Sequence, residues 1–228
     1  MKMAFIGGGV MGETLIARLL QLELIMCENI VVSDPDMERL AYLETTYHIN
    51  RTSINVDAIS RANTVVLAIK PQQLGDVAKQ IAGQLKADQL LISILAGVRI
   101  TTLIDELRHD KIIRAMPNTP GQIGMGMTVW TATPNLIPSE VAFGQTVMSG
   151  LGEELFLEDE ALIDQATAIS GSGPAYVMYF LESLIEAGIG IGLTEEISSK
   201  LAKQTLIGSA MLANQSDKSP GEIRSSVT

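Results

Sequence analysis

The sequence contains little cysteine, histidine, aromatic side chain or charge, and each shortage narrows what the protein can be. Among its 228 residues there is one cysteine, Cys27, so neither an internal disulfide nor a cysteine-based metal site can form. Aromatic residues make up 4% and charged residues 18% of the chain, whereas 46% belong to the set AVILMFWYC. We therefore expect an aliphatic core and no extended disorder.

Long apolar runs and positive charge are scarce too. No stretch approaches the ~18 uninterrupted apolar residues of a membrane helix. The formal net charge of −10 disfavours general attraction to nucleic acid or to an anionic membrane. Small anionic ligands remain possible, since the N–H groups at a helix N-terminus bind anions locally. The first residues enter a predicted strand rather than a secretory signal, so we expect a cytoplasmic protein.

The first part of the chain alternates strand and helix patterns. Near-continuous apolar runs, typical of parallel strands buried on both faces, occur at Lys2–Ile6, Ile30–Ser33, Thr64–Ile69, Leu90–Ile94 and Lys111–Met116. Helices are predicted at Thr14–Leu24, Asp36–Tyr47, Gln72–Leu85 and Pro138–Gly150, the last between strands at Met127–Thr131 and Leu155–Leu157. This order predicts an α/β domain with a doubly wound parallel sheet over residues 1–157.

Strand patterns end at this point, and residues 158–228 predict an all-helical domain. Helices are predicted over Asp159–Ile169, from Pro174 to about Ala187, from the N-cap Thr194 to about Asn214, and from the capping box Ser219-Pro220-Gly221-Glu222 onward. The segment Ser170–Gly173 is expected to interrupt the first two helices, because glycine disfavours helical backbone.

A glycine-rich motif follows the first strand. The segment Phe5-Ile6-Gly7-Gly8-Gly9-Val10-Met11-Gly12 contains G-x-G-x-x-G as Gly7, Gly9 and Gly12. In this motif the first glycine allows a tight turn, the second lets the backbone approach a pyrophosphate, and the third lets helix and strand pack closely. A glycine turn that only packs is the alternative. The position between a strand and an amphipathic helix favours dinucleotide binding.

Asp34 bears on which dinucleotide is bound. It ends the second strand about 20 residues after the motif, where an acidic residue accepts hydrogen bonds from the adenosine ribose and disfavours a 2′-phosphate. This position favours NADH over NADPH. The alternative is that Asp34 only caps the helix that begins at Pro35.

Three other junctions follow strands of the predicted sheet, where ligands bind in doubly wound folds. Ile69-Lys70-Pro71, Ala96-Gly97 and the Asn118 turn are therefore candidate cofactor contacts. Lys70 is equally consistent with a solvated strand-end lysine, and Asn118 between two prolines is also good turn chemistry.

No side chain is obviously placed as a general acid or base. The two histidines, His48 and His109, lie in or beside predicted helices, where we expect surface or capping roles and no metal site. A nicotinamide-binding chain without an evident proton acceptor suits reduction of an already activated group, such as a protonated imine.

The segment Ile169-Ser170-Gly171-Ser172-Gly173-Pro174-Ala175-Tyr176 resembles pyrroline-5-carboxylate reductase, the last enzyme of proline biosynthesis. Matching blocks in family order are Phe5–Gly12, Ala68–Gln72, Leu95–Val98 and Met116–Pro120, so the resemblance spans the chain. It implies hydride transfer from NADPH or NADH to the C=N carbon of 1-pyrroline-5-carboxylate. It also implies a Rossmann-like domain followed by a helical domain that forms a homodimer or larger homo-oligomer.

Carried over by position, the resemblance implies cofactor contacts at Gly8, Val10, Met11, Asp34, Pro35, Asn55, Ile69, Lys70 and Ala96. The residues it places near the substrate are Ser170, Ser172, Gly173 and, by position only, Asp217. A hinge between helices is the alternative for the serine–glycine segment, and a solvated loop acid is the alternative for Asp217. No catalytic acid or base is implied.

The resemblance also raises a question about activity. Family members continue after Thr228 into a segment that grips the substrate carboxylate and then into further helices. We therefore expect these 228 residues to fold and to bind NAD(H), with weak or no reductase activity.

Two other functions remain open on the sequence. A β-hydroxyacid dehydrogenase shares the two-domain plan but uses a lysine after its glycine-rich segment, whereas Gly173 is followed by Pro-Ala-Tyr-Val. A non-catalytic NAD(H)-binding redox sensor would have the same N-terminal half, but no basic helix for a DNA partner is present.

Overall fold

Eight strands form one continuous sheet in the computed structural model, which describes residues 1–227. They are β1 (Met3–Ile6), β2 (Ile30–Ser33), β3 (Asn50–Thr52), β4 (Thr64–Leu67), β5 (Leu90–Ser93), β6 (Ile112–Met116), β7 (Gly126–Ala132) and β8 (Gly152–Phe156). Their spatial order is β3-β2-β1-β4-β5-β6-β7-β8. The first six strands therefore have the 3-2-1-4-5-6 order of a dinucleotide-binding sheet.

Strand direction reverses at one place in this sheet. All neighbours pair in parallel except β6 and β7, which are antiparallel with Arg114 opposite Thr131. The predicted doubly wound sheet is confirmed over the first six strands, while the reversal at β7 was not predicted. A reversal needs no helical crossover, and the single-turn helix η3 (Thr119–Ile123) is the only helix between the two strands.

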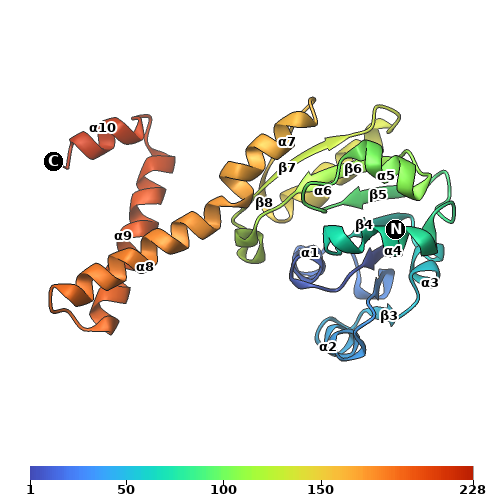
Figure 1. Cartoon of the computed structure of the whole chain (residues 1–228), viewed down its shortest axis with the longest axis horizontal. Coiled ribbons are helices and arrows are strands. Elements are labelled where there is room, and N and C mark those ends of the chain that lie inside the picture. Colours follow the sequence, from blue (N-terminus) through green and yellow to red (C-terminus); the bar gives the residue numbers. More distant parts are fainter. Residues whose placement is uncertain (228) are drawn as a thin grey trace. The chain divides into compact units, whose positions relative to one another are not determined.

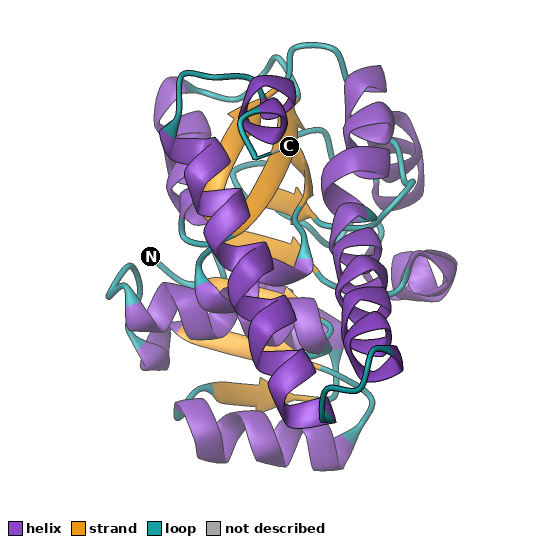
Figure 2. Ribbon diagram, turned by 90° about the vertical axis from the view of Figure 1, so that its left-hand side faces the viewer, coloured by secondary structure: helices purple, strands orange, loops and turns teal. Residues whose placement is uncertain are grey.

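Helices cover both faces of the sheet (Figure 2). Alternate residues of β1 face opposite layers: Met3 and Phe5 pack with α1 (Val10–Gln21), α2 (Met37–Tyr47) and α6 (Pro138–Ser149). Ala4 and Ile6 pack with α3 (Asn55–Ser60), α4 (Leu74–Ile81) and α5 (Ile100–Leu107). This two-sided burial explains why the strands are apolar without alternation.

The remaining helices follow β8. They are α7 (Ala161–Ala166), the π-helical segment η4 (Thr167–Gly171), α8 (Gly173–Gly190), α9 (Glu195–Gln215) and α10 (Pro220–Ser225) (Figure 1). Two short helices lie earlier in the chain, η1 (Cys27–Asn29) and η2 (Pro71–Gln73). The expected interruption at Ser170–Gly173 is present: η4 ends at Gly171, Ser172 belongs to no helix, and α8 begins at Gly173. The helix widens before it ends, since the Ser172 N–H donates to the Thr167 carbonyl, five residues earlier, over 2.8 Å.

The chain divides into two compact units, unit 1 (Met1–Ser172) and unit 2 (Gly173–Thr228). The boundary predicted between residues 157 and 158 marks where strands end. That boundary stays a prediction, because it was placed where the strands give way to helices, whereas the two units are separated by which residues contact one another.

In unit 2, α8 and α9 pack against each other and are otherwise exposed. A side chain at Gly188 would meet the Ser198 hydroxyl at 2.6 Å, so glycine is what permits this close crossing. The two predicted caps are present: the Thr194 side chain accepts from the Ile197 N–H, and Ser219 and Glu222 form a reciprocal capping box. None of the helices formed by residues 1–227 is both long and apolar enough to cross a membrane.

Candidate functional site

A cleft of about 550 Å³ opens at the carboxyl ends of β1, β2 and β4. Gly7 and Gly9 line it after β1, Asp34 and Pro35 after β2, and Ile69 and Lys70 after β4. β1 is the strand from which the chain order departs in both directions, toward β2 on one side and β4 on the other. This is the topological switch point at which doubly wound sheets bind ligands.

The glycine turn between β1 and α1 has little room for side chains. Gly7 has φ of 100°, and a Cβ there would lie 2.6 Å from the Ala68 carbonyl oxygen. A Cβ at Gly12 would lie 2.5 Å from the Gly7 carbonyl oxygen, so only glycine lets α1 approach the turn this closely. At Gly9, the N-cap of α1, a Cβ would meet nothing within 4 Å. The exposed backbone at Gly9 and the first turn of α1 thus form a surface suited to an anion.

Asp34 holds this turn rather than a helix end. One carboxylate oxygen accepts the Gly8 N–H over 2.8 Å and the other accepts the Asp36 N–H over 2.9 Å. The N-cap of α2 is Asp36, whose side chain accepts from Glu38 and Arg39. The alternative in which Asp34 only caps the helix is therefore wrong, since α2 begins two residues later than that interpretation requires.

A cluster of charged and phenolic side chains supports the other side of the turn. Arg39 donates through Nε to the Gly8 carbonyl and pairs through Nη2 with Glu13, while Tyr47 donates to Glu13 over 2.8 Å. Burial raises the pKa of Glu13, but the hydrogen bonds from Arg39 and Tyr47 outweigh it and leave that pKa below its ordinary value. Burial and the Glu13 carboxylate raise the pKa of Tyr47 to about 12. The Arg39 charge is consequently neutralised by Glu13.

The structure brings part of the expected cofactor set into the cleft. Its lining includes seven of those residues: Gly7, Gly9, Asp34, Pro35, Asn55, Ile69 and Lys70. Gly8, Val10, Met11 and Gly12 belong to the same turn and first helical turn, and Pro71 follows Lys70, but these five do not line the cleft. The exposed Ala96 and Gly97 follow β5 and lie outside the lining as well. Sequence reasoning gave no role to Ser33, Gln73 or Gln80, which do line it. Gln73 and Gln80 are seven residues apart, which places both on one face of α4 and of the turn before it. This spacing in the sequence could have indicated that they line the cleft.

Asn118 lies after β6 and contacts the protein through both ends of its amide. Its Nδ2 donates to the Ser170 carbonyl over 2.9 Å, and its Oδ1 accepts the Met127 N–H over 2.9 Å. One N–H of the amide remains for a ligand, so the expected ligand contact stays a prediction. The Ser170 hydroxyl donates to the Ala166 carbonyl over 3.1 Å, within the widened helical turn.

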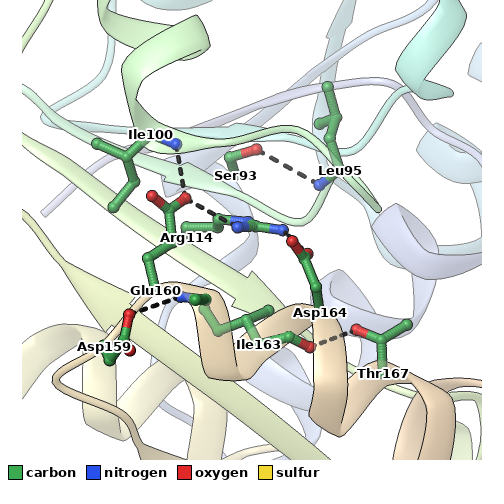
Figure 3. A network of polar contacts seen from close by, with 10 residues as sticks. Ser93, Leu95, Ile100, Arg114, Asp159, Glu160, Ile163, Asp164 and Thr167 are labelled. Carbon is green, nitrogen blue, oxygen red and sulfur yellow. Dashed lines mark hydrogen bonds and ion pairs between the residues drawn. The ribbon is translucent and has the colours of Figure 1, made fainter.

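Arg114 is a residue that sequence reasoning left without a role (Figure 3). Its side chain is 3% exposed and pairs with Glu160 at 2.8 Å and Asp164 at 2.6 Å. Glu160 also accepts the Ile100 N–H at the start of α5 over 2.7 Å. An arginine in the apolar run Ile112–Met116, together with two acids one helical turn apart, was the signal available in the sequence.

Other expected positions lie elsewhere. Gly173 is the first residue of α8, and Asp217 is exposed between α9 and α10, so both belong to unit 2. His48 ends α2 with a φ of 55°, as a capping residue does. His109 is buried, and its Nε2 lies 2.8 Å from the Gln89 carbonyl, so the expected surface or capping role is wrong for it. Within residues 1–227 no group of three His, Cys, Asp or Glu side chains is arranged to hold a metal ion.

Two family models match the chain. Residues 160–228 match the pyrroline-5-carboxylate reductase dimerisation model, and residues 2–97 match a model described as NADP oxidoreductase coenzyme F420-dependent. The two matches cover the helical C-terminal part and the strands that build the cleft.

Individual relatives extend over the whole chain. Pyrroline-5-carboxylate reductase of Synechocystis is 38% identical over 227 residues, covering 100% of this chain and 84% of the relative. The enzyme of Pseudomonas aeruginosa is 36% identical, covering 100% of this chain and 83% of the relative. The solved pyrroline carboxylate reductase of Plasmodium falciparum with NADP bound has a TM-score of 0.90 and 31% identity, covering 100% of this chain and 84% of that one. From this full-length similarity we conclude that the chain belongs to the pyrroline-5-carboxylate reductase family.

Proposed function

We propose that this chain reduces the C=N bond of 1-pyrroline-5-carboxylate to L-proline, with hydride supplied by a nicotinamide cofactor. The observation that carries the proposal is the combination of family membership over the full chain with a strand-end cleft at the switch point of the sheet. Relatives named for this activity cover both the cleft and the helical segment.

The residues of the cleft fit a dinucleotide. Gly9 and the first turn of α1 present backbone N–H groups to a pyrophosphate, because no side chain among the described residues caps that helix. Asp34 is placed at the end of β2 to accept ribose hydroxyls, and Lys70 adds a cation at the end of β4. Val10, Met11, Asn55, Ile69 and Ala96 complete the set that we assign to the cofactor.

The chemistry needs binding and orientation more than proton transfer. When bound, the reduced nicotinamide supplies the hydride, and the protonated imine accepts it at carbon without further acid catalysis. The cleft lining, as far as residues 1–227 describe it, includes no histidine or cysteine. The role left to the protein is to hold the reacting atoms in place, which by itself supplies a large part of many rate enhancements. Ser170 and Ser172 are our candidates on the substrate side, with Gly173 and Asp217 as further candidates from unit 2.

We further propose NADH as the preferred cofactor. Asp34 places a carboxylate in the cleft and is fixed there by the Gly8 and Asp36 N–H groups. Arg39, the cation nearest in sequence, is already paired with Glu13. A 2′-phosphate would thus face an anion without a free cation from this cluster to compensate it.

The helical unit supports assembly into a homodimer or larger homo-oligomer. None of the 18 residues of α8 is buried, although the helix includes Tyr176, Met178, Tyr179 and Phe180, each more than half exposed. An apolar surface of this kind marks an interaction site, and the matching family model is described as a dimerisation region. A cytoplasmic location is part of the same proposal, because the reaction draws on a pool of reduced nicotinamide.

The decisive test follows oxidation of NADH and of NADPH in parallel, with 1-pyrroline-5-carboxylate as the acceptor. We expect imine-dependent oxidation that is faster with NADH, and the turnover number with each cofactor measures the activity. Binding of NADH without any imine-dependent oxidation would favour the redox-sensor alternative. Oxidation of a β-hydroxyacid with NAD⁺, and no imine reduction, would favour a β-hydroxyacid dehydrogenase.

A further inference from the structure

One side of β6 and of the extended residues after it contacts α7, its N-cap Glu160 and η4 at three successive places. Arg114, Met116 and Asn118 are two residues apart and so project from the same side of the extended chain. Arg114 pairs with Glu160 and Asp164. A Cβ at Gly171 would lie 3.1 Å from Met116, and Asn118 donates to the Ser170 carbonyl.

The contacts run in the same direction along both elements. Arg114 pairs with Glu160 and Asp164, at the beginning and middle of α7, whereas Met116 and Asn118, at the carboxyl end of β6 and beyond it, lie beside Gly171 and Ser170 of η4. Glu160 and Asp164 are four residues apart and so lie on one helical face, where one guanidinium can reach both carboxylates. Shifting α7 by one residue would rotate that face by about 100° away from Arg114.

Arg114 is the contact that sets this register. Its guanidinium is buried at the sheet and presents two separate N–H groups to two carboxylates (Figure 3). The planar guanidinium fixes the direction of both bonds, which a single ammonium group does not. Glu160 is in turn fixed by the Ile100 N–H, so that β6, α5 and α7 meet at one carboxylate.

We propose that Arg114 is a positioning residue for the reductase reaction. Through Glu160 and Asp164 it fixes α7 against β6, and thereby it sets where the widened turn Thr167–Gly171 places Ser170 and Ser172 at the carboxyl end of the sheet. The inference rests on the proposed function for its substrate. Arg114 itself lies outside the lining of the cofactor cleft. The ion pairs therefore act on the turn and leave cofactor binding unaffected.

The test compares Asp164→Asn, Arg114→Lys and Arg114→Met with the full wild-type chain. Lys111→Met is the matched control, because it breaks an ion pair with Glu140. Lys111 directly precedes β6, at the end of the strand opposite to the Thr167–Gly171 turn. Each variant is measured for kcat, for KM of pyrroline-5-carboxylate, for the Kd of the nicotinamide cofactor and for hydrogen exchange of the Thr167–Ser172 amides.

We expect Asp164→Asn to lower kcat by about tenfold and to speed exchange of those amides, because misplacement by about 1 Å can cost up to about a hundredfold in rate. Cofactor Kd should stay within about twofold of wild type. Arg114→Lys should recover part of what Arg114→Met loses, since one of the two pairs can re-form. Lys111→Met should change neither kcat nor exchange of the turn.

Unchanged kcat and unchanged exchange in folded Asp164→Asn would overturn the proposal, as would a lowered melting temperature with normal kcat. If Arg114→Met does not fold, Asp164→Asn decides, because that carboxylate is 43% exposed and Glu160 remains to pair with Arg114. A wild-type chain without turnover would refute the proposed function, and the exchange comparison would still show whether Arg114 fixes the turn.

Discussion

At the scale of single residues, the backbone of Gly8 is held from both sides. Asp34 accepts its N–H and Arg39 donates to its carbonyl, while a Cβ on Gly8 would lie 2.6 Å from Leu43 of α2. The glycine turn is thus fixed by two side chains of opposite charge that also line the cleft. Because we propose that Asp34 also decides cofactor choice, substitutions here should change both the turn and that choice.

Replacing Asp34 tests its role in cofactor choice. In Asp34→Ser we expect the ratio of kcat/KM for NADH to that for NADPH to fall about tenfold, because removal of the carboxylate relieves repulsion of a 2′-phosphate and a factor of ten is only about 1.4 kcal/mol. Asp76→Asn is the control, since it removes a carboxylate of the same cleft that is paired with Lys79. A ratio that stays at the wild-type value in Asp34→Ser would contradict the NADH preference.

Glu13 should make stability dependent on pH. Its pKa lies below the unfolded value, so its stabilising contribution is complete above about pH 4.5 and is lost as pH falls through the folded pKa. We expect Glu13→Gln to cost about 1 kcal/mol in urea unfolding at pH 7, with the difference from wild type shrinking as pH falls below about 4.5. Glu44→Gln breaks the more exposed pair with Arg51 and should cost under about 0.5 kcal/mol. A difference that is constant with pH would show that Glu13 stabilises the fold only through packing.

At the scale of elements, the β1–α1 unit is the part in which sequence and geometry agree most closely. Four residues of strand, three glycines and a helix N-terminus form the turn, and close backbone contacts restrict Gly7 and Gly12 to glycine, while the Asp34 and Arg39 side chains hold Gly8. The β6–α7 unit works differently. Its contacts join residues 46 and 50 positions apart, and they depend on ion pairs that only the fold brings together.

Two glycine substitutions separate folding from binding in the β1–α1 unit. Gly12→Ala should lower stability by about 1–3 kcal/mol, because its Cβ would overlap the Gly7 carbonyl. Gly9→Ala should fold normally, since nothing lies within 4 Å of its Cβ, but it should weaken NADH binding by placing a methyl group where we assign the pyrophosphate. Gly75→Ala, in open space on α4, is the control: it should leave NADH binding unchanged and should not lower stability, since alanine favours a helix more than glycine does. Thermal unfolding and NADH titration check these expectations, and tight NADH binding by Gly9→Ala would contradict the assigned phosphate position.

How far the sequence predicts this molecule depends on how local each feature is. The strands Ile30–Ser33 and Leu90–Ser93 and the helix from Pro138 were predicted nearly to the residue, since apolar runs and a proline at the first helical turn are local signals. β3 was missed because three polar edge residues carry no apolar pattern. α5 was also missed. Its amphipathic eight residues directly follow a glycine turn and were not separated from it.

The candidate site likewise divides into features that local sequence patterns predict and features that only the fold brings together. The glycine motif and Asp34 were predicted to lie together because their spacing is set by one strand–helix–strand unit, and the structure places them in one cleft. The partners of Arg114 and the tether from Asn118 to Ser170 were not predicted, because they join segments about 50 residues apart. Finding them requires the packing of α7 on β6.

At the scale of the whole molecule, the two units differ in how they achieve stability. Unit 1 buries two hydrophobic clusters, one on each face of its sheet. The helices of unit 2 bury only Ser198 and Ala202 among the residues described. The exposed apolar side chains of these helices cost free energy in water unless another surface covers them. We infer that a second copy of the chain covers them.

This inference predicts the effect of a charge on α8. Tyr179→Glu, at a side chain that is 72% exposed, should convert the wild-type oligomer into monomers at micromolar concentration, because burying an unpaired carboxylate in an apolar interface is strongly unfavourable. Ile123→Glu places the same charge at a 71% exposed apolar residue of unit 1 and should leave the oligomer intact. Light scattering during size-exclusion chromatography measures both. A wild-type chain that is monomeric, or a Tyr179→Glu variant that stays assembled, would contradict the inference.

The single tryptophan has a practical consequence of a different kind. Trp130 of β7 is 1% exposed, and its ring meets that of Phe156 edge-on with the centroids 4.8 Å apart. Its indole N–H donates to Glu154 of the neighbouring strand β8. All indole emission therefore originates in the core of unit 1, and unit 2 adds none. Melting of the sheet should shift this emission to longer wavelength, whereas melting of α8 and α9 should appear only in circular dichroism. Since a reduced nicotinamide absorbs light that indole emits, quenching of this one fluorophore by energy transfer would also record cofactor binding without any added label.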